Sequence, residues 1–160
     1  MNNPVIVSTA PFDGYDLAVA IEEIALTGAD GIEIAFIEGY TDPFTEDDFT
    51  RGYADEISSY LTKHNLPCLS FSAHMDLTKA NGLEIFKRRM TFARRLGAEF
   101  IITNAAPLAK KEEFLSTIKA LGAFAKDIGI KIGLENPGDG KINVLDTAQA
   151  AAPVIDQIAL

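Results

Sequence analysis

The sequence is poor in cysteine and has no long apolar run. Cys68 is the single cysteine among 160 residues, so no disulfide can form within the chain. No apolar stretch is long enough to cross a bilayer, and residues 1–4 lack the basic segment that precedes the apolar run of a signal peptide. These absences favour a cytoplasmic protein that does not contact a membrane.

The charge and the missing motifs exclude further classes of function. The formal net charge is −9, so the chain repels phosphate backbones and nucleic acid is not a favoured partner. The sequence has no phosphate-binding loop, dinucleotide fingerprint, zinc-type Cys/His spacing or serine-centred elbow. Hydrophobic residues make up 48% of the chain, which is enough for a core of its own. We therefore treat residues 1–160 as a single domain.

Short aliphatic runs alternate with longer helical patterns along the whole chain. The five runs are residues 5–9, 31–36, 68–74, 100–104 and 130–135. Each run is followed by an amphipathic segment, as in the strand-helix units of a parallel sheet. Thr45 and Asp48 resemble a capping box that would start the second helix, and Pro153 is expected to kink or break the fifth. The basic residues 87–89 of the third helix are expected to lie on a solvated face.

Five strand-helix units fit either a partial (β/α) barrel or an open flavodoxin-like sheet. An open sheet has helices on both faces, so both sides of its central strands should be apolar. Here only one side is apolar: Ile32 and Ile34 point opposite to Glu33. The loop at residues 10–14 also has a single glycine and does not resemble a flavodoxin phosphate loop. The pattern favours an α/β fold of the parallel (β/α) barrel type, with strands in sequential order and all helices on one face.

Two residues at strand ends are the strongest candidates for chemistry, because active sites of parallel barrels form where the strands end. Glu135 ends the fifth run, next to a polar loop at 136–140. Its carboxylate can ligate a divalent cation or take a proton from carbon, or it can merely cap a turn. His74 ends the third run and can bind a substrate hydroxyl or a metal, unless it is an ordinary buried histidine. Both side chains are expected on one rim, pointing toward the barrel axis.

Asn104 and Glu33 are weaker candidates. Asn104 ends the fourth run and can orient a substrate oxygen, although asparagine is common in turns that follow strands. Glu33 lies in the middle of the second strand on the inner side. It is either a site residue or the partner of Lys131 inside the barrel, and the pair is the favoured interpretation.

Four motifs, in order, resemble those of the xylose isomerase-like TIM barrels. They are Gly28-Ala29-Asp30-Gly31-Ile32-Glu33-Ile34, Ser72-Ala73-His74-Met75-Asp76-Leu77, Arg95-Leu96-Gly97-Ala98-Glu99-Phe100-Ile101-Ile102 and Leu134-Glu135-Asn136. The resemblance covers essentially the whole chain. It implies a partial TIM barrel of about five of the eight βα units, in which the chain forms the N-terminal part.

The family includes sugar isomerases, ketose epimerases and apurinic endonucleases. Resemblance to its sugar-active branches implies proton transfer next to a carbonyl through an enediolate, in a sugar or sugar phosphate. It also implies one divalent metal, manganese or similar, in the complete barrel. Glu135 would be the first metal ligand and a proton-transferring acid. His74, Asn104 and Glu33 would bind the sugar.

Two departures from the family pattern matter. The endonuclease branch ends its fourth strand in histidine, proline and glycine, where this chain has Asn104-Ala105-Ala106. A metal-dependent phosphodiesterase is therefore only an alternative, as is a non-catalytic partial barrel that folds or assembles. The resemblance also places the other metal ligands on the sixth to eighth strands, beyond Leu160. The chain alone is expected to be inactive, to hold no cofactor tightly, and to associate with itself or with a complementing barrel segment.

Overall fold

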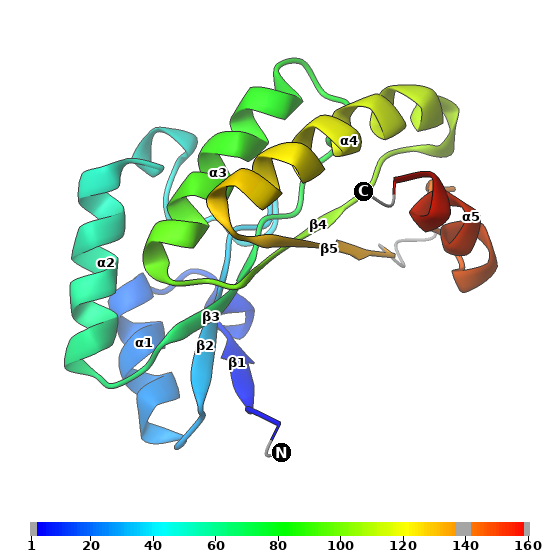
Figure 1. The fold of residues 1–160 in the computed structure, drawn as a ribbon. Coiled ribbons are helices and arrows are strands. Elements are labelled where there is room, and N and C mark those ends of the chain that lie inside the picture. The colour runs from blue at the N-terminus through cyan, green and yellow to red at the C-terminus, as the bar shows by residue number, and fades with distance from the viewer. Residues whose placement is uncertain (1–2, 137–141, 159–160) are drawn as a thin grey trace.

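The fold is a single parallel sheet with helices between its strands. The computed structural model describes residues 3–136 and 142–158. The strands are β1 Ile6–Ser8, β2 Gly31–Ala35, β3 Cys68–Ser72, β4 Phe100–Asn104 and β5 Lys131–Glu135. The helices are α1 Leu17–Leu26, α2 Arg51–Lys63, α3 Gly82–Leu96, α4 Lys111–Ile128 and α5 Ala148–Ile158 (Figure 1). The strand order β1-β2-β3-β4-β5 confirms the predicted sequential pairing.

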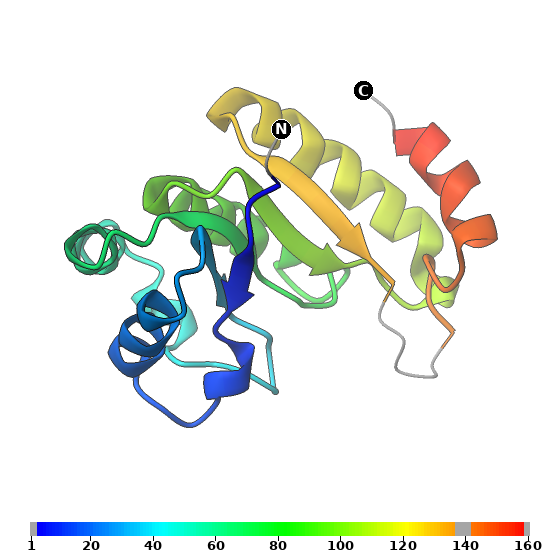
Figure 2. The same ribbon diagram turned by 90° about the horizontal axis from the view of Figure 1, so that it is seen from below.

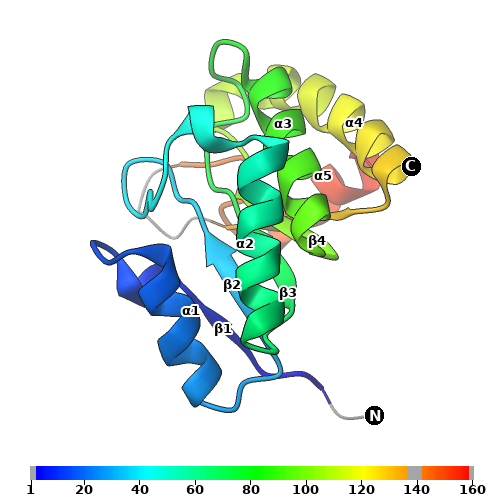
Figure 3. The same ribbon diagram turned by 90° about the vertical axis from the view of Figure 1, so that its left-hand side faces the viewer.

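Helices α1 to α4 lie on one face of the sheet (Figures 1 and 3). The side chains of Ile32, Ile34 and Ile101 point into this layer and are 0% exposed. Helix α5 packs against α4 at the β5 end of the sheet (Figure 2). The alternation of apolar and polar residues in the strands therefore produces a sheet with one covered face, as a barrel wall requires.

The other face of the sheet is more apolar than the sequence pattern indicated. Ser70 and Gly133 lie on this inner side, as expected for a small, polar surface. Strand β4, however, contributes Phe100 and Ile102, and β1 contributes Ile6. Ile6 and Phe100 are 39% and 41% exposed, so this face has apolar surface that the described residues do not cover.

An aromatic cluster joins α2, α3 and the segment after β2 to the covered face of the sheet. Its members are Phe36, Phe44, Phe49, Tyr53, Phe71 and Phe92. The rings of Phe36 and Phe49 meet edge to face with centroids 4.9 Å apart, and those of Phe49 and Phe92 with centroids 5.0 Å apart. Burial of each ring stabilises the fold by roughly 2 kcal/mol, and the cluster thereby fixes the chain that leads into α2.

Two helix boundaries differ from the predictions. The Thr45–Asp48 capping box is present, but it caps a short 3₁₀ helix at Glu46–Asp48. Helix α2 begins only after Thr50, whose Oγ1 accepts a hydrogen bond from Tyr53 N at 3.2 Å. Pro153 lies inside α5 without ending it, so of the two expected effects, a kink or a break, the break is wrong. No helix in the described ranges is both long and apolar enough to cross a membrane.

A cysteine and an arginine are both buried in this fold, with different consequences. Cys68 is buried at the start of β3, and burial raises the pKa of its thiol to about 12. The thiol therefore stays protonated and unreactive at neutral pH. Arg89, by contrast, is fully buried and does not belong to a solvated face. Its partners come from a distant segment, so the helical pattern alone gave no sign of this burial.

We expect Gly82→Ala to destabilise the protein, because a Cβ at Gly82 would lie 2.6 Å from the carbonyl oxygen of Leu77. Overpacking against backbone costs about 1–3 kcal/mol. Gly52→Ala is the matched control, since a Cβ at Gly52, also in the first turn of a helix, meets nothing within 4 Å. The control should raise stability by up to about 1 kcal/mol. Urea unfolding measures both, and equal effects would show that the α3 start is not tightly packed.

Candidate active site

The candidate site lies where β3, β4 and β5 end. Strands β4 and β5 pair in register, so that Asn104 and Glu135 are direct neighbours across the sheet. His74 follows the last residue of β3 by two positions. Because the carboxyl ends of parallel strands meet at one edge, these three side chains reach the same rim.

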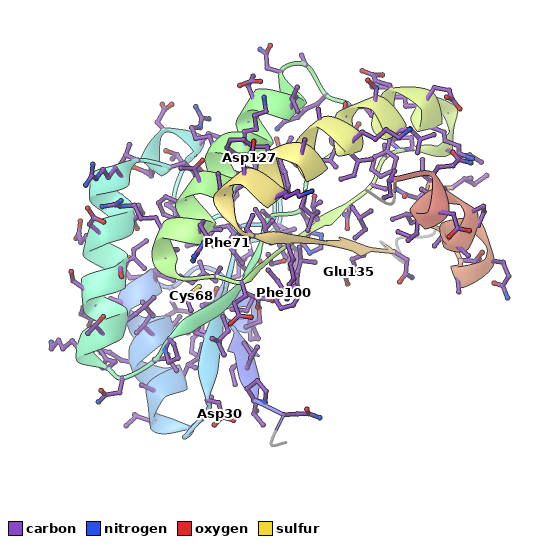
Figure 4. All side chains as sticks on the ribbon, viewed as in Figure 1. Asp30, Cys68, Phe71, Phe100, Asp127 and Glu135 are labelled. Carbon is purple, nitrogen blue, oxygen red and sulfur yellow. The ribbon has the colours of Figure 1, made fainter. Side chains whose placement is uncertain are left out.

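The three side chains form a connected chain of polar contacts. His74 Nδ1 and Asn104 Oδ1 are 2.8 Å apart, and His74 Nε2 and Glu135 Oε2 are 3.3 Å apart. The His74 side chain is 12% exposed, whereas that of Glu135 is 55% exposed. Figure 4 shows Glu135 at the tip of β5. The structure thus brings together three of the four predicted site residues, and His74 and Glu135 share one rim as expected.

The contacts restrict where the hydrogen of the His74 ring can be. A carboxamide oxygen only accepts hydrogen bonds, so His74 Nδ1 is the donor to Asn104 Oδ1. Nε2 of a neutral ring then presents an electron pair to the Glu135 carboxylate. Two electron pairs in contact would repel each other. A cation beside both atoms would remove this repulsion.

His74 and Glu135 together suit part of a metal site. Nitrogen and oxygen ligands lie about 2.0–2.2 Å from a divalent ion such as zinc, so donors 3.3 Å apart can share one ion. Within residues 3–136 and 142–158, no group of three or more His, Cys, Asp or Glu residues could hold a metal. The part of the chain that the structure describes therefore supplies two donors and not a full coordination shell.

Glu33 lies apart from the other three residues. Its Oε2 accepts a hydrogen bond from Ser70 Oγ at 2.8 Å, on the inner face of the sheet. In the part of the chain that the structure describes, no ion pair joins Glu33 to Lys131, so that expectation is wrong. The Lys131 ammonium lies instead 4.8 Å from the centre of the Phe100 ring. Lys131 is exposed at the start of β5, the end of that strand opposite to the rim.

Two hollows lie beside the site. One of about 370 Å³ is lined by His74 and Asn104, together with Glu38 and Asp76. The other, of about 590 Å³, lies on the inner face and includes Glu33, Ser70, Phe100 and Glu135. Both volumes are in the range of small-molecule sites. The contact between His74 and Glu135 therefore joins the two hollows.

An ion pair at the rim was missed by the sequence patterns. Lys79 Nζ bonds both carboxylate oxygens of Glu38, at 2.6 and 2.7 Å. The backbone N–H of Glu38 also donates to the His74 carbonyl at 3.2 Å. Glu38 follows the second strand, but its partner Lys79 is 41 positions away and belongs to a loop. No local pattern links such residues.

We expect Asn104→Leu to change the state of the His74 ring, because the Nδ1 hydrogen loses its acceptor. The hydrogen should move to Nε2, where it can donate to Glu135, and the free energy of unfolding should fall by about 1 kcal/mol. Imidazole ¹H–¹⁵N correlation spectra at neutral pH measure the tautomer. Asn104→Asp retains an acceptor and should keep the Nδ1–H form. An unchanged spectrum for Asn104→Leu would mean that the Asn104 contact does not set the tautomer.

Solved structures share this fold. The D-allulose 3-epimerase from Methylomonas sp., crystallised with D-allulose, is 18% identical, has a TM-score of 0.74, and matches 99% of this chain and 60% of its own. The IolI protein with a bound zinc atom is also 18% identical, with a TM-score of 0.74 over 98% of this chain and 59% of its own. A xylose isomerase domain protein from Planctomyces limnophilus is 13% identical, with a TM-score of 0.75 over 98% of this chain and 60% of its own length.

At these identities the similarity shows the fold alone, and this chain spans about 60% of the length of each of these three proteins. No curated protein matches the sequence. A family model described as xylose isomerase-like TIM barrel matches residues 21–160, which include all four motifs, from Gly28 to Asn136, and the three strand ends of the site. The parallel sheet, its barrel-type neighbours and this match agree. The chain belongs to the xylose isomerase-like TIM barrel family.

Proposed function

We propose that this chain is the N-terminal portion of a divalent-metal-dependent sugar or sugar phosphate isomerase or epimerase. The observation that carries the proposal is the placement of Glu135 beside His74 and Asn104 on one rim. The solved D-allulose 3-epimerase, which has the same fold, supports a sugar as the small-molecule substrate. The buried, unpaired Cys68 supports a reducing compartment such as the cytoplasm.

In this proposal the residues of the rim divide the work of a proton transfer. Glu135 takes a proton from the carbon next to the sugar carbonyl, and the electron pair of that C–H bond moves toward the carbonyl oxygen. His74 and Asn104 hydrogen-bond sugar hydroxyls in the hollow that both of them line, and Glu33 contacts the sugar from the inner face. A bound divalent cation, with Glu135 as its first ligand, would supply positive charge that stabilises an enediolate.

A phosphodiesterase of the endonuclease type is less well supported. A multi-metal cluster needs many imidazole and carboxylate ligands, but Asn104 occupies the end of β4 and contacts His74 instead. A neutral amide there adds no charge to balance several cations. The pair of donors at His74 and Glu135 suits a single ion better.

We expect this chain alone to bind manganese weakly and to have no measurable isomerase activity. Two donors leave most of the coordination shell to water, so the affinity should be close to that of an exposed carboxylate. Calorimetry with Mn²⁺ measures this for the chain, for Glu135→Gln and for the control Glu99→Gln, which alters an exposed acid at the opposite end of the sheet. Tight one-to-one binding that only Glu135→Gln removes would show that the chain assembles a complete site.

Association is the second part of the proposal. Strand β1 pairs only with β2 and strand β5 only with β4 within the described residues, so each has an open edge. The inner face adds exposed apolar side chains at Ile6 and Phe100. Such a surface favours a partner that covers it, and we propose a second copy of this chain, with a complementing barrel segment as the alternative.

Sedimentation should therefore detect association at high micromolar concentration. Phe100→Ser should weaken it by roughly tenfold, since loss of a buried ring contact is on the scale of 1.4 kcal/mol. Leu26→Ser is the control, because Leu26 is the last residue of α1, on the helical side of the sheet, and is even more exposed. A stable monomer, or an equal effect of both substitutions, would contradict association through the inner face.

A further inference from the structure

Arg89 of α3 is a fully buried arginine next to the aromatic cluster. Its guanidinium carbon lies 4.6 Å from the centre of the Phe36 ring and 5.7 Å from that of Phe49. Burial of a charged group without partners would be strongly unfavourable. The groups that Arg89 bonds therefore determine what it does in the fold.

Arg89 connects two distant parts of the chain. Its Nε donates to Glu46 Oε1 at 2.8 Å and its Nη2 bonds the same oxygen, while Nη1 donates to the Ala73 carbonyl at 3.2 Å. Arg88 Nη2 bonds the second Glu46 oxygen at 3.0 Å. Burial opposes ionisation of Glu46, but the hydrogen bonds and charges of Arg89 and Arg88 outweigh it and lower the pKa of Glu46. Glu46 and Arg89 thus form a charged pair at neutral pH.

These bonds converge on the backbone that carries His74. Ala73 directly precedes His74, and its own N–H donates to the Ile102 carbonyl at 2.7 Å. The segment between β2 and α2, which holds Glu46, also bonds this backbone directly, because Glu38 N donates to the His74 carbonyl at 3.2 Å. The chain between β2 and α2 therefore bonds the His74 carbonyl directly, through Glu38, and the preceding Ala73 carbonyl indirectly, through the Glu46–Arg89 pair.

We propose that Arg89 and Glu46 form a clamp that positions His74, so that Arg89 is a positioning residue of the candidate site. The inference rests on the proposed function, in which His74 contacts the substrate. The planar guanidinium suits this task because one group reaches both the Glu46 carboxylate and the Ala73 carbonyl. Without the clamp, the peptide before His74 loses a charge-assisted bond, and the ring loses its fixed approach to Asn104 and Glu135.

The test separates positioning from stability. Removal of Glu46 alone leaves the buried Arg89 charge without its carboxylate and endangers folding, whereas replacement of both members by apolar residues of similar size is often neutral. The double variant Arg89→Met/Glu46→Leu therefore keeps the fold but loses the bond to Ala73. The surface pair Arg95–Asp55 serves as the control, as Arg95→Gln/Asp55→Asn.

The readout is the imidazole ¹H–¹⁵N spectrum of His74 at a fixed neutral pH in the 160-residue chain. The chain has two histidines, so a His64→Gln variant assigns the signals. In the clamp double variant we expect shifted His74 resonances and a mixture of both tautomers, with a urea midpoint within about 10% of the unmodified chain. The surface variant should leave His74 unchanged. The readout needs neither sugar nor metal, so it stays informative if the proposed function fails.

An unchanged His74 spectrum in the folded double variant would overturn the proposal and make the clamp purely structural. If the double variant does not fold, Arg89→Lys provides the decisive measurement. Lysine keeps a positive charge toward Glu46 but lacks the fork that also reaches the Ala73 carbonyl. The same loss of the single His74 tautomer is expected. A native His74 spectrum in folded Arg89→Lys would equally contradict positioning by Arg89.

Discussion

The parallel register of β3, β4 and β5 is the constraint on which the site depends. Asn104 and Glu135 are register partners, and His74 extends from the neighbouring strand to contact both. In a strand the side chains alternate between faces, so a shift of one residue would turn Glu135 toward the helices. The covered face, packed by α1 to α4, makes such a shift unfavourable. The core thereby fixes the chemistry at the rim.

Much of the fold could be predicted because it is encoded locally. Alternation in the strands indicated one covered face, and glycines such as Gly97 and Gly129 mark helix ends with positive φ. The position of Glu135 and His74 at strand ends followed from the same patterns. The inner face is more apolar than the second run indicates, because Phe100 and Ile102 of the fourth run point inward.

The unpredicted features depend on contacts between residues far apart in the sequence. Arg89 is buried because Glu46, 43 positions away, meets it under the aromatic cluster. The Glu38–Lys79 pair likewise joins two loops. In both cases the local sequence shows only charged residues near a helix or a turn, which is typical of solvated surface. Helical periodicity cannot reveal a partner that another segment supplies, and these contacts set the backbone around His74.

The central proposal is that Glu135 binds a divalent cation on the rim that it shares with His74. A crystal structure of the chain soaked in Mn²⁺, with anomalous diffraction at the manganese edge, tests it most directly. The account predicts a peak, of low occupancy if binding is weak, beside the Glu135 carboxylate, with His74 Nδ1 still bonded to Asn104. Peaks confined to other acidic residues, or a Glu135 side chain packed under the helices, would contradict it.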